Sequence, residues 1–219
     1  MRLRGVAGKG GTVISSDERH WNDLYAERDD ERLSWYQAWP VRSLEWVESC
    51  GLDPDAGIID VGAGTSSLLA SLWERGHWDL WWLDISPLAR ERAAQALGEA
   101  AEHLHWLVGD VTRIPLPRHR FAIWHDRAVF HFLTRGEERA AYVAQAREAL
   151  SPGGHLMMAT FAEDGPRQCS GLPTMRYDPE SLMAEFGPDF ELLRTSRERH
   201  LTPGGAVQWF RWFLLRQGA

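Results

Sequence analysis

Short apolar runs recur along the chain and alternate with segments of helical spacing. Each run is too short for a helix and is apolar on both faces, which is typical of strands buried in a parallel sheet. The runs are Ile58 to Val61, Trp78 to Leu83, Leu104 to Val108, Phe121 to Trp124 and Leu156 to Phe161. The pattern predicts that these runs are parallel strands at the centre of one sheet.

Helical spacing and helix-capping residues mark the segments between the runs. We expect one helix from Ser34 to Ser49, ended by Gly51, and another from Ser66 to Arg75. The stretches SPLARERAAQAL and TRGEERAAYVAQAREAL open with capping residues, the second with Thr134 and Glu137 as a capping box. Strands that alternate with helices indicate βαβ units, and therefore a sheet with helices on both faces.

The C-terminal part departs from this alternation. After a short helix that opens at Asp178-Pro179, the runs FELLRTSRERH and AVQWFRWFLLR follow each other across LTPGG with no helix between them. This arrangement predicts an antiparallel hairpin. Large apolar side chains occupy both faces of its second strand, so we expect that strand inside the sheet and not at its edge. They are Val207, Trp209 and Phe213 on one face and Phe210, Trp212 and Leu214 on the other.

Composition and charge narrow the classes of partner. A chain of 219 residues suits one α/β domain, and its net charge of −7 with a pI near 5.7 gives no electrostatic basis for binding nucleic acid. Cys50 and Cys169 lack the CxxC spacing of zinc sites, so we expect neither a metal nor a disulfide framework. The start lacks a signal-peptide core, and no apolar run approaches the ~18 residues of a membrane span. We expect a cytoplasmic protein that is a monomer or a homodimer and does not bind membranes.

The stretch GIIDVGAGTSSLL places a glycine-rich turn between a buried strand and a helix. Such turns let a ligand approach the backbone closely, and they bind phosphates, dinucleotides or S-adenosylmethionine. No Gly-Lys-Ser/Thr follows, which excludes a P-loop. The third glycine of the dinucleotide fingerprint would fall at Ser67, so that alternative is weakened but stays open.

The segment DVGAGTSSL resembles motif I of the class I S-adenosylmethionine-dependent methyltransferases. Further landmarks follow in order over about residues 55 to 161: Asp84 at the end of the second strand, Asp110 in LVGDVT, the segment IWHDRAVFHFL, and the turn LSPGGHLMMATF. The resemblance implies a doubly wound, mostly parallel seven-stranded sheet with helices on both faces and an antiparallel C-terminal hairpin. It implies a single domain over residues 1–219, with a flexible start and cap helix in 1–50 and a Rossmann-like core in 51–219.

The same resemblance implies S-adenosylmethionine as cofactor, with S-adenosylhomocysteine as its product. Asp84 would accept the ribose hydroxyls and Asp110 would face the adenine amino group. Asp60 would meet the ammonium, and the backbone of the glycine turn the methionine portion. The implied cofactor-binding set is Asp60, Gly62, Ala63, Gly64, Asp84, Ile85, Asp110, Val111 and His125. In the alternative interpretation, Asp60, Asp84 and Asp110 only cap local turns or helices.

The N-terminal stretch HWNDLYAERDDERLSWYQAWP resembles the entrance helix of subfamilies that include the lysine methyltransferases of citrate synthase and of elongation factors. There an aromatic segment folds over the cofactor. Trp21, Tyr25 and Trp35 would be the matching rings here, with Tyr36 toward the substrate, and aromatic faces attract a sulfonium. Alternatively, this is an amphipathic helix whose rings pack on the core, and both interpretations can hold together.

Candidate acceptor-side residues follow the fourth strand, on the edge where ligands bind in such sheets. In HDRAVFHF we expect His131 as a general base if the acceptor arrives protonated, with Asp126 orienting His131 or the substrate. His125 is a further catalytic candidate, and Arg127 would contact substrate. The structural alternatives are a half-buried His131 that closes a helix start and a local Asp126–Arg127 ion pair.

The segment from Ala162 to Tyr177 has no periodicity, and loops of this length usually serve a function. It would lie over the acceptor site in this fold, which makes Arg167, Cys169 and Arg176 candidate substrate contacts. Cys169 can equally be an inert cysteine.

Methyl transfer to a small molecule is the function these features favour. The chain lacks the Asn-Pro-Pro-Tyr motif by which related enzymes grip nucleic-acid bases. Protein lysine methylation, a non-catalytic cofactor-binding module and an NAD-linked oxidoreductase remain as alternatives.

Overall fold

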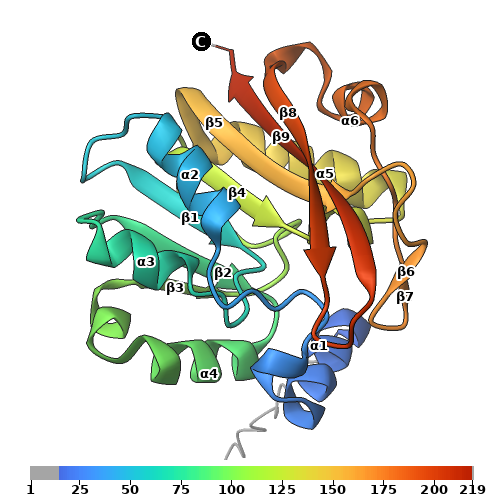
Figure 1. The fold of residues 1–219 in the computed structure, drawn as a ribbon. Helices are drawn as coiled ribbons and strands as arrows, with labels where there is room; N and C mark the ends of the chain where they lie inside the picture. Colours follow the sequence, from blue (N-terminus) through green and yellow to red (C-terminus); the bar gives the residue numbers. More distant parts are fainter. Residues whose placement is uncertain (1–14, 219) are drawn as a thin grey trace, which may run out of the picture.

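A single seven-stranded sheet organises the part of the chain that the computed structural model describes, residues 15–218 (Figure 1). The strand order is β3-β2-β1-β4-β5-β9-β8. Strands β1 to β5 are parallel, and β9 runs antiparallel to both β5 and β8. The bounds are β1 Gly57–Val61, β2 Leu80–Asp84, β3 His105–Val108, β4 Phe121–Arg127, β5 Leu150–Phe161, β8 Phe190–Leu201 and β9 Val207–Gln217. The expected mixed α/β sheet is confirmed.

Helices cover both faces of this sheet and enclose two apolar clusters. One cluster packs the sheet against α1 to α4 and includes Trp46 and Leu68, and the other packs it against α5 and α6 and includes Tyr142 and Leu182. In Figure 1, α2, α3 and α4 lie in front of the sheet and α5 lies behind it. The bounds are α1 Ser16–Glu27, α2 Val41–Ser49, α3 Leu68–Glu74, α4 Pro87–Leu97, α5 Gly136–Ala149 and α6 Pro179–Phe186. None of the helices in residues 15–218 is long and apolar enough to cross a bilayer.

Three helix starts differ from the sequence expectation. The helix expected from Ser66 begins at Leu68. The helix expected from Ser34 begins only at Val41, because Pro40 disfavours helical backbone in the residue before it. The capping box expected at Thr134 and Glu137 lies one residue later. There the N–H of Arg135 donates to a carboxylate oxygen of Glu138 at 3.4 Å, and the helix begins at Gly136.

The C-terminal hairpin has the expected place in the sheet. Strand β9 lies between β5 and β8, with Phe210 and Trp212 in one apolar cluster and Phe213 in the other. The expectation that both faces are buried is wrong at the tip, where Val207 is 42% exposed and Trp209 36% exposed. The tip is exposed because the pairing of β5 with β9 ends at Phe210.

A small two-stranded ribbon lies within the stretch that has no sequence periodicity. Its strands are β6 Gln168–Cys169 and β7 Leu172–Pro173. Figure 1 shows this ribbon beside the β8–β9 hairpin, on the side of the molecule where α1 lies. The segment that follows α1 contacts the C-terminal hairpin, since Nε2 of His200 donates to the carbonyl of Ser34 and Gln37 donates to Glu198. The flexible start expected within residues 1–14 lies outside the described residues.

Candidate functional site

A cavity of about 440 Å³ opens at the carboxyl ends of the parallel strands. Ligands of open α/β sheets bind at this edge. Acidic and apolar residues that follow β2 and β3 line one part of the cavity, and residues after β4, on β5, in the ribbon and on β9 line another. A smaller cavity of about 50 Å³ lies beside Asp60 and Ser66. Both cavities are lined by Trp35, Gly62 and Arg127, so they adjoin at these residues.

The glycine turn after β1 requires residues without side chains at two positions. Gly62 has φ +63° and Gly64 has φ +50°, in the left-handed region that favours glycine. A Cβ on Gly62 would overlap a methyl group of Val129, and one on Gly64 would overlap the hydroxyl of Tyr25. Between them, the N–H of Ala63 donates to a carbonyl of β2 at 3.1 Å. The turn therefore passes tightly between the segment after β4 and the N-terminal helix.

Asp84 ends β2 and joins the glycine turn to the next helix. Its Oδ2 accepts from the N–H of Gly64 at 3.0 Å and its Oδ1 from the N–H of Ser86 at 2.9 Å. The hydroxyl of Ser86 in turn caps α4. Burial raises the pKa of Asp84 to about 6, and the two backbone N–H groups limit the rise. Each oxygen keeps a second acceptor position, so this carboxylate can cap locally and also accept from a ligand in the cavity.

The residues expected around the adenine also line the large cavity. Ile85, Asp110 and Val111 all contribute to its wall. Asp110 Oδ1 accepts from the N–H of Thr112 at 2.9 Å and from its hydroxyl at 2.7 Å, which is the local turn cap considered above. As with Asp84, the capping role and a place in the cavity occur together.

Asp60 belongs to a buried hydrogen-bonded chain with His125 and Ser43. Asp60 Oδ1 lies 2.7 Å from Nδ1 of His125, whose Nε2 lies 2.9 Å from the hydroxyl of Ser43. The second carboxylate oxygen of Asp60 is buried without a partner among residues 15–218. That oxygen is an unmet acceptor for a cationic group in the smaller cavity. His125 has both ring nitrogens engaged and lines the smaller cavity but not the large one, so a catalytic role for His125 is not supported.

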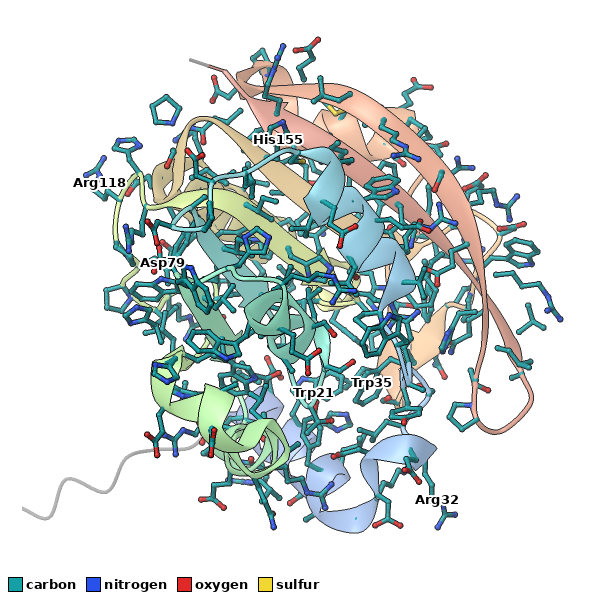
Figure 2. All side chains as sticks on the ribbon, turned by 60° about the vertical axis from the view of Figure 1, so that its left-hand side comes forward. Trp21, Arg32, Trp35, Asp79, Arg118 and His155 are labelled. Atoms are coloured by element: carbon teal, nitrogen blue, oxygen red, sulfur yellow. The ribbon has the colours of Figure 1, made fainter. Side chains whose placement is uncertain are left out.

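The N-terminal aromatic residues cover the large cavity and also pack on the core. Trp21, Tyr25 and Trp35 line the cavity, and their rings meet edge to face, with Trp35 5.8 Å from Trp21 and 6.3 Å from Tyr25. All three belong to or pack against the apolar cluster on that face. Figure 2 shows Trp21 and Trp35 close together beside the ribbon of the N-terminal segment. Tyr36 lines the smaller cavity instead.

Arg127 and His131 bring unpaired polar atoms to the large cavity. Arg127 donates from Nη1 to the carbonyl of Trp35 at 2.8 Å, and its guanidinium carbon lies 4.9 Å from the ring centre of Phe210. His131 is fully buried, and its Nδ1 accepts from the N–H of Phe161 at 3.2 Å. Burial and the nearby guanidinium lower the pKa of His131 to about 3. Arg127 Nε and Nη2 and His131 Nε2 have no partner within residues 15–218.

Asp126 does not orient His131, contrary to the sequence expectation. Its Oδ1 accepts from the N–H of Val129 at 2.9 Å, and its Oδ2 accepts from the N–H of Phe130 at 3.1 Å and from the hydroxyl of Tyr142 at 2.5 Å. These bonds cap the short 3-10 helix Phe130–Phe132. The carboxylate is therefore fully engaged away from the cavity, and the expected ion pair with Arg127 is not formed either.

The ribbon region contributes one of its three expected residues to the cavity. Cys169 lines it, with its sulfur 3.6 Å from the hydroxyl of Ser34. Arg167 is exposed, and Arg176 donates to the carbonyl of Glu163 at 3.0 Å. Neither arginine lines the cavity. Sequence analysis missed the other wall residues in this part, which are Phe132, Phe161, Leu172, Pro173, Gln208 and Phe210.

Comparisons with known proteins show similarity to methyltransferases. A family model described as "Methyltransferase domain" matches residues 58–154. The EEF1A lysine methyltransferase 2 of Danio rerio is 24% identical over 172 residues, which are 76% of this chain and 68% of that protein. A ubiquinone/menaquinone biosynthesis C-methyltransferase of a Ruegeria strain is 27% identical over 131 residues, 58% of this chain and 50% of that protein. The chain spans only 17% of a third relative, an eEF1A lysine and N-terminal methyltransferase homolog of Drosophila melanogaster.

Solved structures share the fold over nearly the whole chain. A methyltransferase of Anabaena variabilis superposes with a TM-score of 0.67 at 17% identity, covering 99% of this chain and 100% of that one. A toxoflavin-precursor N1-methyltransferase of Burkholderia thailandensis, solved with S-adenosylhomocysteine, gives 0.63 at 19% identity, covering 93% and 85%. The ordered motifs, the cavity that they line and these matches lead to one conclusion. Residues 58–154 match the methyltransferase-domain model, and the chain has the Rossmann-like fold of the class I S-adenosylmethionine-dependent methyltransferases.

Proposed function

We propose that this methyltransferase acts on a small-molecule acceptor, which binds in the part of the large cavity near Arg127, His131 and Phe210. One cavity runs from the acidic residues after β2 and β3 to these side chains. Cofactor and acceptor would therefore share one enclosure. S-adenosylmethionine supplies an electrophilic methyl group on a sulfonium. The protein's task is then to align the acceptor and to exclude water.

The residues at the other part of the cavity fit this cofactor. Asp84 would accept the ribose hydroxyls, and Asp110 would face the adenine beside Val111. The unpartnered oxygen of Asp60 would meet the cofactor's ammonium, since it is a buried acceptor that lacks a donor. The backbone of the glycine turn would face the methionine portion, because Gly62 lines both cavities and Ala63 lines the smaller one.

The charge of the acceptor region distinguishes between a small-molecule acceptor and a protein lysine. Its buried charged group is the guanidinium of Arg127, while the neighbouring carboxylate of Asp126 is turned away. A lysine side chain arrives as an ammonium, which a nearby guanidinium repels. This arrangement favours a neutral or anionic small molecule over a protein lysine.

Protein lysine methylation is the second candidate. The alignment with the zebrafish EEF1A lysine methyltransferase 2 over 76% of this chain favours it, as does the aromatic N-terminal segment. The acidic chain and the lack of a base-gripping motif disfavour nucleic acid as an acceptor.

Labelled S-adenosylmethionine and a cell extract divided into protein and metabolite fractions would test the proposal. We expect label to enter the metabolite fraction with release of S-adenosylhomocysteine. Label in the protein fraction would assign the lysine alternative. Cofactor binding without any S-adenosylhomocysteine release would identify a non-catalytic binding module.

A further inference from the structure

We infer that the acceptor binds as an anion, and that its charged group lies between the guanidinium of Arg127 and the Nε2–H of His131. The inference rests on the proposed function, because it specifies the chemical class of that small-molecule acceptor. It also replaces the general-base role expected for His131 with the role of a hydrogen-bond donor.

Arg127 carries a charge that its surroundings leave without a direct counter-ion. Its side chain forms no ion pair with any residue in 15–218, and two of its three guanidinium nitrogens are buried without a hydrogen-bond partner. Burial lowers its pKa, and the negative charges of Glu198 and Asp60 partly oppose that shift. Both oxygens of Glu198 already accept hydrogen bonds, from Gln37 and Trp212. A buried, unpaired cation costs several kcal/mol, and an anionic ligand would remove that cost.

The hydrogen bond at Nδ1 fixes the tautomer of His131. Nδ1 accepts from the N–H of Phe161, so a neutral ring carries its proton on Nε2. To act as a general base toward the cavity, His131 would need a lone pair on Nε2, and its proton would then be on Nδ1. That proton would point at the N–H of Phe161, so two donors would face each other. The low pKa set by burial and by Arg127 agrees with a ring that stays neutral. His131 therefore presents a donor, not a base, to the cavity.

The two donors converge on the same part of the cavity. The rings of Phe210 and His131 have centroids 6.3 Å apart, and the guanidinium of Arg127 stacks on the same Phe210 ring. His200, another nearby titratable group, donates from Nε2 to the carbonyl of Ser34, and burial lowers its pKa. The positive and neutral donors therefore share the apolar wall formed by Phe210.

An anionic acceptor removes the need for a base in methyl transfer. The anion's lone pair forms the bond to the methyl carbon, the electrons of the broken bond remain on sulfur, and no proton moves. Arg127 lines both cavities beside Gly62, where the two proposed parts of the cofactor would meet. A carboxylate, phenolate or thiolate next to Arg127 would therefore lie close to the reacting methyl.

Calorimetry on the protein saturated with S-adenosylhomocysteine tests the inference with two probes of the same shape, benzoate and benzamide. We expect benzoate to bind roughly 10-fold more tightly, because a charge-assisted pair adds about 1.5 kcal/mol. Arg127→Gln should remove this preference and leave the affinity for S-adenosylhomocysteine unchanged. Arg118→Gln is the matched control, since Arg118 lies on the far side of the molecule from Trp21 and Trp35 (Figure 2).

Two results would overturn the inference. Equal affinity for benzoate and benzamide in the unchanged protein would show that the cavity does not select an anion. A weaker affinity of Arg127→Gln for S-adenosylhomocysteine would instead assign the guanidinium to the cofactor's own carboxylate. Neither result would touch the proposed small-molecule function, which the labelled metabolite fraction tests separately.

Two substitutions of His131 distinguish a donor from a base. Glutamine keeps an N–H donor but offers no basic nitrogen, whereas leucine removes both. In the benzoate assay, His131→Gln should stay within about 3-fold of the unchanged protein and His131→Leu should lose roughly 10-fold. Equal losses in the two variants would exclude the donor role.

Discussion

The cofactor part and the acceptor part of the cavity are built in different ways. The cofactor part takes its polar residues from the ends of three neighbouring parallel strands, between Asp60 and Val111. The acceptor part collects side chains from the N-terminal segment, the end of β4, the ribbon and the β8–β9 hairpin. The first is a local construction repeated strand by strand, whereas the second exists only when distant segments meet.

The two parts also differ in how their polar atoms are satisfied. Asp84 and Asp110 each accept hydrogen bonds from nearby backbone N–H groups, so the empty protein already holds them in place. Arg127 and His131 keep buried donors without partners. Apart from the unpartnered Oδ2 of Asp60, the cofactor part is therefore preorganised by the fold, whereas the acceptor part is completed by its ligand.

Gly62→Ala should have the largest effect on the cofactor part. The new methyl group would overlap Val129, and φ of +63° strains any residue with a Cβ. The overlap costs about 1–3 kcal/mol and the backbone strain about 1–2 kcal/mol, so affinity for S-adenosylhomocysteine should fall by ~100-fold. Gly51→Ala is the control, because Gly51 has φ +60° and open space around it. If the two variants had the same midpoint of urea denaturation and the same affinity for S-adenosylhomocysteine, the proposed close packing of Gly62 against Val129 would be refuted.

Asp84→Ala should weaken S-adenosylmethionine and S-adenosylhomocysteine alike, because both carry the ribose. Losing charge-assisted bonds costs about 1.5–3 kcal/mol, or one to two decades in affinity. Asp79 precedes the other end of the same strand, where it pairs with Arg120, and it is also buried. Asp79→Ala should lower the melting temperature and leave affinity unchanged. Calorimetry that shows full affinity in Asp84→Ala would remove the ribose assignment.

Trp35→Ala should have a smaller effect, confined to retention of the cofactor. Its ring lines both cavities, and an aromatic face near a sulfonium contributes about 1 kcal/mol. The off-rate of S-adenosylmethionine should rise roughly 5- to 10-fold by stopped-flow fluorescence. Trp78→Ala, an exposed tryptophan outside both cavities, is the control. An unchanged off-rate would mean that the aromatic segment is only part of the core.

Acid should weaken cofactor binding gradually. The pKa of Asp84 is raised to about 6 in the empty protein, and accepting two hydroxyls favours its ionised form. Bound ligand should therefore lower that pKa, so affinity stays constant above about pH 7 and falls by at most ~10-fold per pH unit as pH drops through 6. Asp84→Asn should flatten this profile in calorimetry from pH 5 to 8. The same slope in Asp84→Asn would assign the effect to another group.

The cofactor part was predictable because its signals are local. Glycine spacing after β1 and single acidic residues after β2 and β3 can each be recognised within a short stretch. The parallel strands and the position of β9 inside the sheet were predicted from equally local patterns of apolar residues. The later start of α2 also has a local cause, which is Pro40. The sequence prediction gave more weight to the helical spacing around Pro40 than to the proline itself.

The acceptor part was only partly predictable because its geometry depends on tertiary contacts. His131 and Arg127 were found from their place after β4, but the role of His131 depends on an N–H of β5 that no motif signals. The sequence suggested Asp126 as a partner for His131 or Arg127. In the structure its carboxylate instead accepts hydrogen bonds from Tyr142 and from two backbone N–H groups. Phe210 came from the far end of the chain, where the sequence pattern indicated only a buried strand.

A crystal structure of the protein with S-adenosylhomocysteine tests the division of the cavity most directly. We predict that the ribose hydroxyls lie within hydrogen-bond distance of the Asp84 carboxylate. The sulfur should lie beside Gly62, with the space between Arg127 and His131 left for an acceptor. Ribose bound away from Asp84, or any part of S-adenosylhomocysteine between Arg127 and His131, would contradict this account.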